Sequence, residues 1–108
     1  MPAELFGHNI AVSCGHCVIL IKTSNGAVRV VAGSTNEYGY RDSMKGQEAR
    51  FSCPKGLTCI RNCLFVTDFW NNVIRCVNLN TTQVETVMDF TPSAPVGLAV
   101  AWALNKDY

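Results

Sequence analysis

Forty residues, from Ala49 to Met88, constrain the fold of this chain more than any other stretch. They hold four short runs rich in β-branched and aromatic residues, and Asn, Asp, Thr and Gly fill the gaps between the runs. This composition is typical of strands joined by tight turns. The runs are Gly56–Ile60, Cys63–Asp68, Val73–Asn78 and Val84–Met88. We therefore predict an all-β fold in which these runs form a four-stranded antiparallel meander, about the size of one propeller blade.

The same runs carry a family pattern. Its positions are Ala49-Arg50-Phe51, Pro54, Gly56-Leu57, Leu64-Phe65-Val66, Asp68, Asn71-Asn72, Ile74-Arg75, Val84 and Val87. This spacing resembles the NHL repeat, a β-propeller family, from Gly33 to Val87. The resemblance implies propeller blades, and a fold by itself does not determine a function.

Residues 1–33 are interpreted as a shortened blade. Asn9–Ser13 and Cys17–Lys22 parallel the first two runs of the later unit, and Ala27–Ala32 returns as a further strand. Asn25-Gly26 predicts a type I′ hairpin turn between the last two, since both residues tolerate positive φ. The second strand matches at an offset of 46 and the last at 56, so the first unit is expected to lack one strand. A match of the last strand at 46 stays open as the alternative.

The rest of the chain divides around the full blade, which covers residues 49–94. Residues 34–48 are interpreted as an inter-blade loop because Gly, Asn, Asp and Ser are frequent in them. Residues 95–108 are interpreted as the first strand of a further blade, since Pro95-Val96-Gly97-Leu98 repeats Pro54-Lys55-Gly56-Leu57 at an offset of 41. Propellers typically close with four to eight blades. We therefore expect an incomplete propeller that needs more blades or self-association.

Candidate binding residues come from two predicted loops. In a propeller, the loops between blades share a face with those joining strands two and three, so the resemblance places Phe69–Asn72 beside the inter-blade loop. The candidates are Tyr38, Tyr40, Arg41, Phe69, Trp70, Asn71 and Arg75. The alternative is that the aromatic side chains seal the contact between blades.

Three residues are expected to shape turns instead of binding a ligand. Asp68 ends the second run, where its carboxylate can accept N–H bonds from the following turn. Asn72 and Gly56 are assigned turn roles as well. Arg75 is expected either to pair with Asp68 or a neighbouring blade, or to be an exposed ligand contact.

Six cysteines are expected to be reduced and to pack as small apolar residues. Cys14-Gly15-His16-Cys17 matches the letters of a disulfide-isomerase centre, in which the reactive cysteine begins a helix. An apolar β-type run follows it here, so we interpret it as a hairpin without redox activity. A zinc site built from Cys14, Cys17, Cys59 and Cys63 is a further alternative, because both pairs would flank equivalent hairpins.

The function predicted from these patterns is a non-catalytic protein-interaction module without a cofactor. Motifs for phosphate binding, metalloproteases, serine hydrolases and kinases are absent. The alternative is single-stranded RNA binding, since residues 41–75 hold six Lys/Arg against three acids beside aromatic side chains. A part of a propeller hydrolase or lyase ranks third. With a net charge of +1 and no recognisable signal or membrane-spanning stretch, we expect a cytoplasmic protein.

Overall fold

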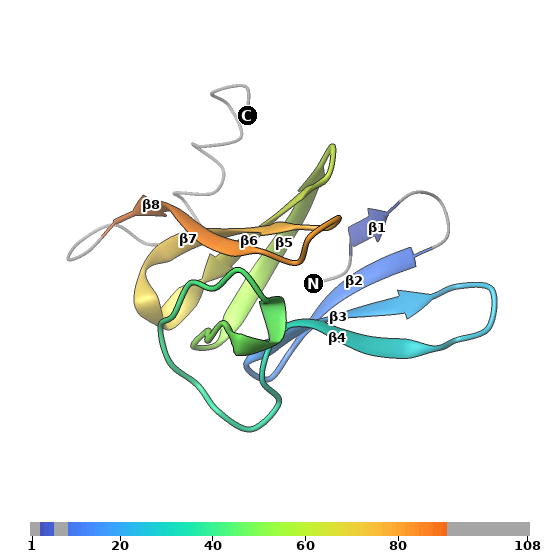
Figure 1. The fold of residues 1–108 in the computed structure, drawn as a ribbon, viewed down its shortest axis with the longest axis horizontal. Helices are drawn as coiled ribbons and strands as arrows, with labels where there is room; N and C mark the ends of the chain where they lie inside the picture. The colour runs from blue at the N-terminus through green and yellow to red at the C-terminus, as the bar shows by residue number, and fades with distance from the viewer. Residues whose placement is uncertain (1–2, 6–8, 91–108) are drawn as a thin grey trace.

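The computed structural model describes residues 3–5 and 9–90. Within them, the regular elements are strands and two short 3-10 helices, η1 (Gly46–Glu48) and η2 (Phe69–Asn71). The strands are β1 (Ala3–Leu5), β2 (Asn9–Cys14), β3 (Cys17–Lys22), β4 (Val28–Gly33), β5 (Pro54–Ile60), β6 (Cys63–Asp68), β7 (Val73–Asn78) and β8 (Val84–Asp89). They form two four-stranded antiparallel sheets, ordered β1-β2-β3-β4 and β5-β6-β7-β8 (Figure 1). The all-β prediction and the blade-like meanders are confirmed.

The prediction that the first unit lacks a strand is wrong. The short β1 pairs with β2 and completes the sheet. By position, Cys17–Lys22 is therefore the third strand, and the Cys14–Cys17 hairpin joins strands two and three. The offset of 56 now holds for the third and fourth strands of the two sheets. Strand β3 starts at 17 and β7 at 73, and β4 starts at 28 and β8 at 84.

The hairpin between β3 and β4 lies where it was predicted but is not a type I′ turn. Such a turn needs positive φ at both central residues. Only Gly26 of the Asn-Gly pair has one, at 75°. Its N–H donates to the Lys22 carbonyl, and the Asn25 side chain accepts the N–H of Ala27. The hairpin loop is therefore longer than the two residues of a type I′ turn, with Gly26 as its left-handed position.

The main core lies between the two sheets. Register places Leu64 opposite Val77 and Leu57 opposite Val66, so these four side chains share the face of the second sheet that meets the first. The buried residues of this cluster are Ala11, Val18, Leu20, Val31, Ala32, Ala49, Phe51, Leu57, Leu64, Val66, Val77 and Val84. Ala49 and Phe51 belong to the connection between the sheets, so that segment is part of the core as well.

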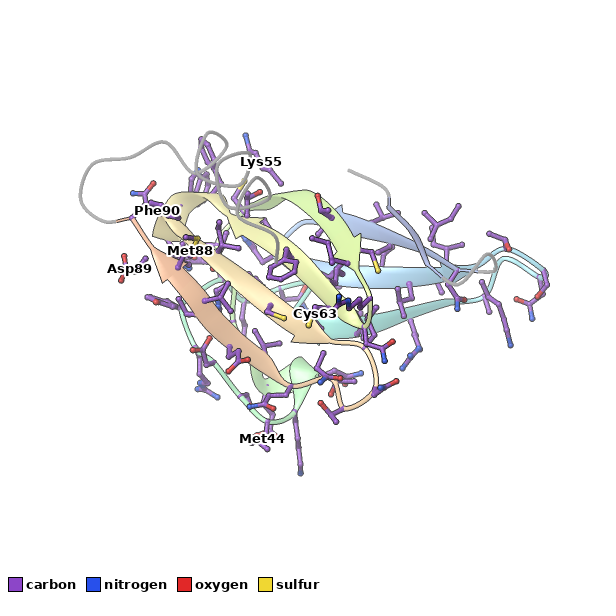
Figure 2. The ribbon with its side chains drawn as sticks, turned by 90° about the horizontal axis from the view of Figure 1, so that it is seen from above. Met44, Lys55, Cys63, Met88, Asp89 and Phe90 are labelled. Carbon is purple, nitrogen blue, oxygen red and sulfur yellow. The ribbon has the colours of Figure 1, made fainter. Side chains whose placement is uncertain are left out.

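The opposite face of the second sheet is apolar too. Ile74 is buried there, and half-buried apolar side chains of β6 and β8 and the residue after β8 pack against it (Figure 2). Those side chains are Phe65, Val87, Met88 and Phe90. A sheet with apolar side chains on both faces is typical of an inner layer. The predicted strand at 95–108 lies outside the described residues.

The segment from 34 to 53, here called the linker, joins the sheets and covers strand edges. Ser43 pairs with Val84 through two backbone hydrogen bonds, and the Asp42 carboxylate accepts the N–H of Thr86, 2.9 Å away. The outer edge of β8 is therefore paired along its first half. An exposed edge would be a template for joining another chain.

Candidate binding surface

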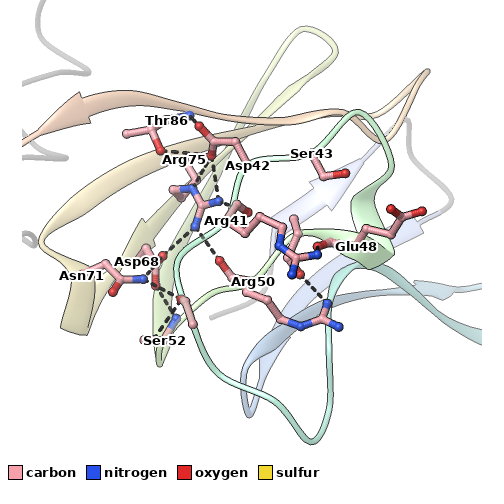
Figure 3. A network of polar contacts seen from close by, with 12 residues as sticks. Arg41, Asp42, Ser43, Glu48, Arg50, Ser52, Asp68, Asn71, Arg75 and Thr86 are labelled. Carbon is pink, nitrogen blue, oxygen red and sulfur yellow. Dashed lines mark hydrogen bonds and ion pairs between the residues drawn. The ribbon is translucent and has the colours of Figure 1, made fainter.

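The linker is fixed by the guanidinium of Arg75, which is fully buried on β7. Its Nη1 donates to Asp68 Oδ2 at 2.8 Å and to the Arg50 carbonyl at 2.9 Å. Its Nη2 donates to the Arg41 carbonyl and to Asp42 Oδ1, and Nε donates to the same Oδ1 (Figure 3). All five N–H groups thus have acceptors, and four of these N–H groups donate to three acceptor atoms of the linker. The prediction that Arg75 pairs with Asp68 is confirmed, whereas an exposed ligand contact is excluded by its burial.

Two aromatic rings cover the guanidinium. Its central carbon lies 4.7 Å from the ring centroid of Phe51 and 5.2 Å from that of Tyr40. Both distances suit a cation–π interaction. One face of the Tyr40 ring therefore packs on the Arg75 guanidinium, although the residue is 52% exposed.

Asp68 holds the linker to β6. Its Oδ1 accepts the N–H of Ser52 at 2.7 Å, and Oδ2 accepts Asn71 Nδ2 at 2.7 Å besides Arg75. Asp68 was expected to accept a backbone N–H from the turn that follows it, and this prediction is wrong. The backbone N–H that Asp68 accepts comes from Ser52 in the linker. Burial raises the pKa of the Asp68 carboxyl above its ordinary value, although Asn71, Ser52 and Arg75 all oppose the shift.

The turn assignment agrees with the local geometry for Asn72, whereas Gly56 is not in a turn and lies inside strand β5, where the pairing with β6 shifts register. Asn72 ends η2 in the left-handed region, at φ 55°. Gly56 lies against Thr67, whose hydroxyl accepts the Gly56 N–H, and a β-carbon at Gly56 would come within 2.8 Å of that hydroxyl oxygen. Both positions therefore serve the backbone of the second sheet.

Three connections meet at one end of the two sheets, and we call this the loop face. Asn71 Nδ2 donates to the Gly39 carbonyl at 2.9 Å, and the Trp70 N–H donates to the Ser52 carbonyl at 3.1 Å. The connection between β6 and β7 therefore lies against the linker, as the resemblance implied.

The third connection, the β2–β3 turn, was not assigned to this face from the sequence. Its His16 accepts the N–H of Cys53 at Nδ1, 3.1 Å away. The His16 ring lies 5.6 Å from that of Tyr38 and 6.3 Å from that of Trp70. His16 thus joins the first sheet to the linker and to the second sheet. In the sequence, the only indication of this role is that His16 lies in a predicted hairpin. That hairpin was predicted between the first and second strands, whereas it joins the second and third.

The loop face exposes four of the predicted aromatic side chains. Tyr38 is 70% exposed, Trp70 63%, Tyr40 52% and Phe69 40%. The backbones of Trp70 and of Gly39, which follows Tyr38, are nevertheless held by the hydrogen bonds described above, so the Trp70 and Tyr38 rings project from a fixed base. The arrangement suits recognition of a surface and not enclosure of a small molecule.

The cations near this face are largely engaged with the protein. Arg41 Nη1 donates to the Glu48 carbonyl, and Arg50 Nη1 donates to the carbonyls of Gln47 and Ala49. The Lys55 ammonium lies 4.5 Å from the centroid of the Phe69 ring. Arg75 is buried together with Asp68, so residues 41–75 keep an excess of three positive charges at the surface, and several of these cations already contact groups of the protein.

The cysteine pairs do not converge. Cys14 and Cys17 flank the β2–β3 hairpin, whereas Cys59 and Cys63 flank the β5–β6 hairpin, so the two hairpins are not equivalent by sheet position. In the part of the chain that the structure describes, no three His, Cys, Asp or Glu side chains are placed to hold a metal ion. Burial raises the pKa of the Cys17 thiol, which opposes the reactivity of a redox cysteine.

Comparison with known proteins places these features in a family context. No protein-family model matches the chain. NHL repeat-containing protein 2 of Homo sapiens is 31% identical over 78 residues, which are 72% of this chain and 10% of that protein. The Bos taurus and Gallus gallus proteins of the same name are 31% and 32% identical over equal lengths. The chain thus spans about a tenth of the length of these curated relatives.

Within residues 3–5 and 9–90, no helix is long and apolar enough to cross a membrane.

The sequence similarity covers most of the chain, and the two four-stranded meanders are of the kind that propeller blades are made of. The chain is therefore related to the NHL-repeat family of β-propeller proteins.

Proposed function

We propose that this chain is a non-catalytic protein-interaction module that binds its partner through the loop face. The observation that carries the proposal is the exposure of Tyr38 and Trp70, at 70% and 63%, on segments where the Gly39 carbonyl and the Trp70 N–H are fixed by hydrogen bonds to Asn71 and Ser52. Tyr and Trp are enriched at protein interfaces and among the residues that contribute most to affinity. A fixed backbone reduces the entropy that is lost on binding. The proposed compartment is the cytoplasm, where the six cysteines would stay reduced.

A protein partner is favoured over single-stranded RNA by the state of the cations. RNA binding without sequence preference combines stacked aromatic side chains with a positively charged groove. Here Arg75 is fully buried, and Arg41 and Arg50 donate to backbone carbonyls. Arg50 also lies 3.7 Å from the Glu37 carboxylate. The arginines described near the aromatic side chains are thus engaged within the protein, which makes them less available to a phosphate backbone.

The test compares Trp70→Ala and Tyr38→Ala with Met44→Ala, a control at a linker position that is also 70% exposed. Partners captured by the wild-type chain are identified, purified and titrated against each variant. We expect the dissociation constant to rise at least tenfold for the aromatic variants, as is typical of central interface residues. Met44→Ala should bind like the wild type. Equal affinities for all four proteins, or tight binding of an oligouridylate that depends on Trp70, would refute the proposal.

A further inference from the structure

The first residues of β4 form an uncovered strand edge in the part of the chain that the structure describes. Strand β4 is last in the first sheet, so one side of it has no neighbouring strand (Figure 1). The Lys22 N–H donates to the Ala27 carbonyl, and the alternation of antiparallel pairing then directs the backbone of Arg29 toward β3. The N–H and C=O groups of Val28 and Val30 must therefore point outward.

Only the later half of this edge is covered. Gln47 Nε2 donates to the Val30 carbonyl at 3.0 Å, which agrees with the outward direction. Helix η1 lies so close to β4 that a β-carbon on Gly46 would come within 2.0 Å of the Val31 carbonyl oxygen. Among residues 3–5 and 9–90, none pairs with the outward backbone groups of Val28, which is 59% exposed.

Two hollows flank this free edge and share Arg29. One, of about 370 Å³, is lined by Asn9, Leu20, Lys22, Ala27, Val28 and Arg29. The other, of about 480 Å³, is lined by Arg29, Val30, Val31, Lys45, Gly46, Gln47, Glu48 and Thr82. Together they hold three cations and one carboxylate, and that carboxylate, Glu48, already lies 3.7 Å from the Lys45 ammonium.

We propose that an extended acidic peptide adds as a strand to β4 at Val28, a site separate from the loop face. Strand addition supplies main-chain hydrogen bonds, and pockets along the edge select alternate side chains. Because side chains of a strand alternate between its two sides, a docked peptide directs acidic residues toward Lys22 and Arg29. Its backbone bonds to the N–H and C=O of Val28. The charge of the hollows excludes a basic peptide.

The experiment uses the full chain and an acetylated, amidated hexapeptide of alternating glutamate and valine. Val28→Pro removes the outward N–H, and proline is tolerated at the first residue of an edge strand. Val28→Thr keeps the N–H and is the matched control. We expect the dissociation constant to rise at least tenfold for Val28→Pro and to stay within twofold for Val28→Thr. Lys22→Glu combined with Arg29→Glu should abolish binding of this peptide.

Two further probes keep the proposal falsifiable if Val28→Pro fails to fold. A hexapeptide methylated at alternate backbone nitrogens should lose binding to the wild-type chain, and so should one with lysine in place of glutamate. Equal binding of the methylated and unmethylated peptides would overturn strand addition. Equal binding of the lysine peptide, or no binding of the glutamate peptide at millimolar concentration, would overturn the proposal as well.

Discussion

Removing the guanidinium of Arg75 should destabilise this fold more than any surface substitution. Arg75→Met keeps an apolar stem but leaves the Asp68 carboxylate, which is 0% exposed, without its cation. The carbonyls of Arg41 and Arg50 lose their donors in the same step. Breaking a buried ion pair by removing one partner costs about 3–5 kcal/mol. A domain of this size has a total stability of about 5–15 kcal/mol, so a large share of it would be lost.

The measurement is a urea titration followed by tryptophan fluorescence. With a slope of about 1–3 kcal/mol per molar urea, the midpoint should fall by at least ~1 M. Adding Asp68→Asn to Arg75→Met removes the orphaned charge and should restore part of the loss, whereas two independent effects would add. An Arg75→Met midpoint equal to that of the wild type would refute the reasoning. So would a double variant that is less stable than the sum of the singles predicts.

Three further predictions concern pH, packing and assembly. Burial raises the folded-state pKa of the Asp68 carboxyl above 3.8, so the protonated carboxyl favours the folded state. Its contribution to the free energy of unfolding is fully present below the unfolded pKa and is lost as pH rises through the folded pKa. Asp68→Asn should flatten this pH dependence in urea titrations at several acidic pH values. Gly46→Ala should cost at least ~2 kcal/mol in the same assay because its β-carbon would overlap the Val31 carbonyl, whereas Gly26→Ala, with open space but φ 75°, should cost about 1 kcal/mol. The half-buried apolar face around Ile74 should favour self-association, which light scattering over a concentration series would detect; a monomer with a cooperative thermal transition unchanged on dilution would contradict it.

Strand positions were predictable because local composition determines them. Cys17–Lys22, Cys63–Asp68 and Val73–Asn78 match the observed strands residue for residue, and the ends of the other strands predicted within the described residues shift by at most two residues. Strand β1 was missed because three residues carry almost no periodic signal, and their pairing with β2 is known only from the sheet. That one omission moved every strand of the first unit by a position and made the Cys14–Cys17 hairpin look equivalent to the wrong one.

The candidate site was predictable in its location but not in its internal contacts. The resemblance brought Phe69–Asn72 and the linker to one face, since that follows from propeller connectivity. The burial of Arg75 did not follow, because its partner Asp42 is 33 residues away in the sequence. The contact of His16 with Cys53 spans 37 residues and depends on the relative placement of the two sheets. Such long-range polar contacts have no periodic signature.

The linker connects stability with recognition. It gives Ala49 and Phe51 to the core, three acceptor groups to Arg75, a paired segment to β8 and the exposed Tyr38 to the loop face. Because Tyr38 lies on a segment that Arg75 holds in place, loss of the guanidinium should weaken partner binding although Arg75 is buried and contacts no partner. Arg75 is thus a positioning residue in the proposed function. A binding defect there that disappears when the folded fraction is corrected for would limit its role to stability, whereas a defect that persists in the folded molecules would show that the linker orients the aromatic side chains.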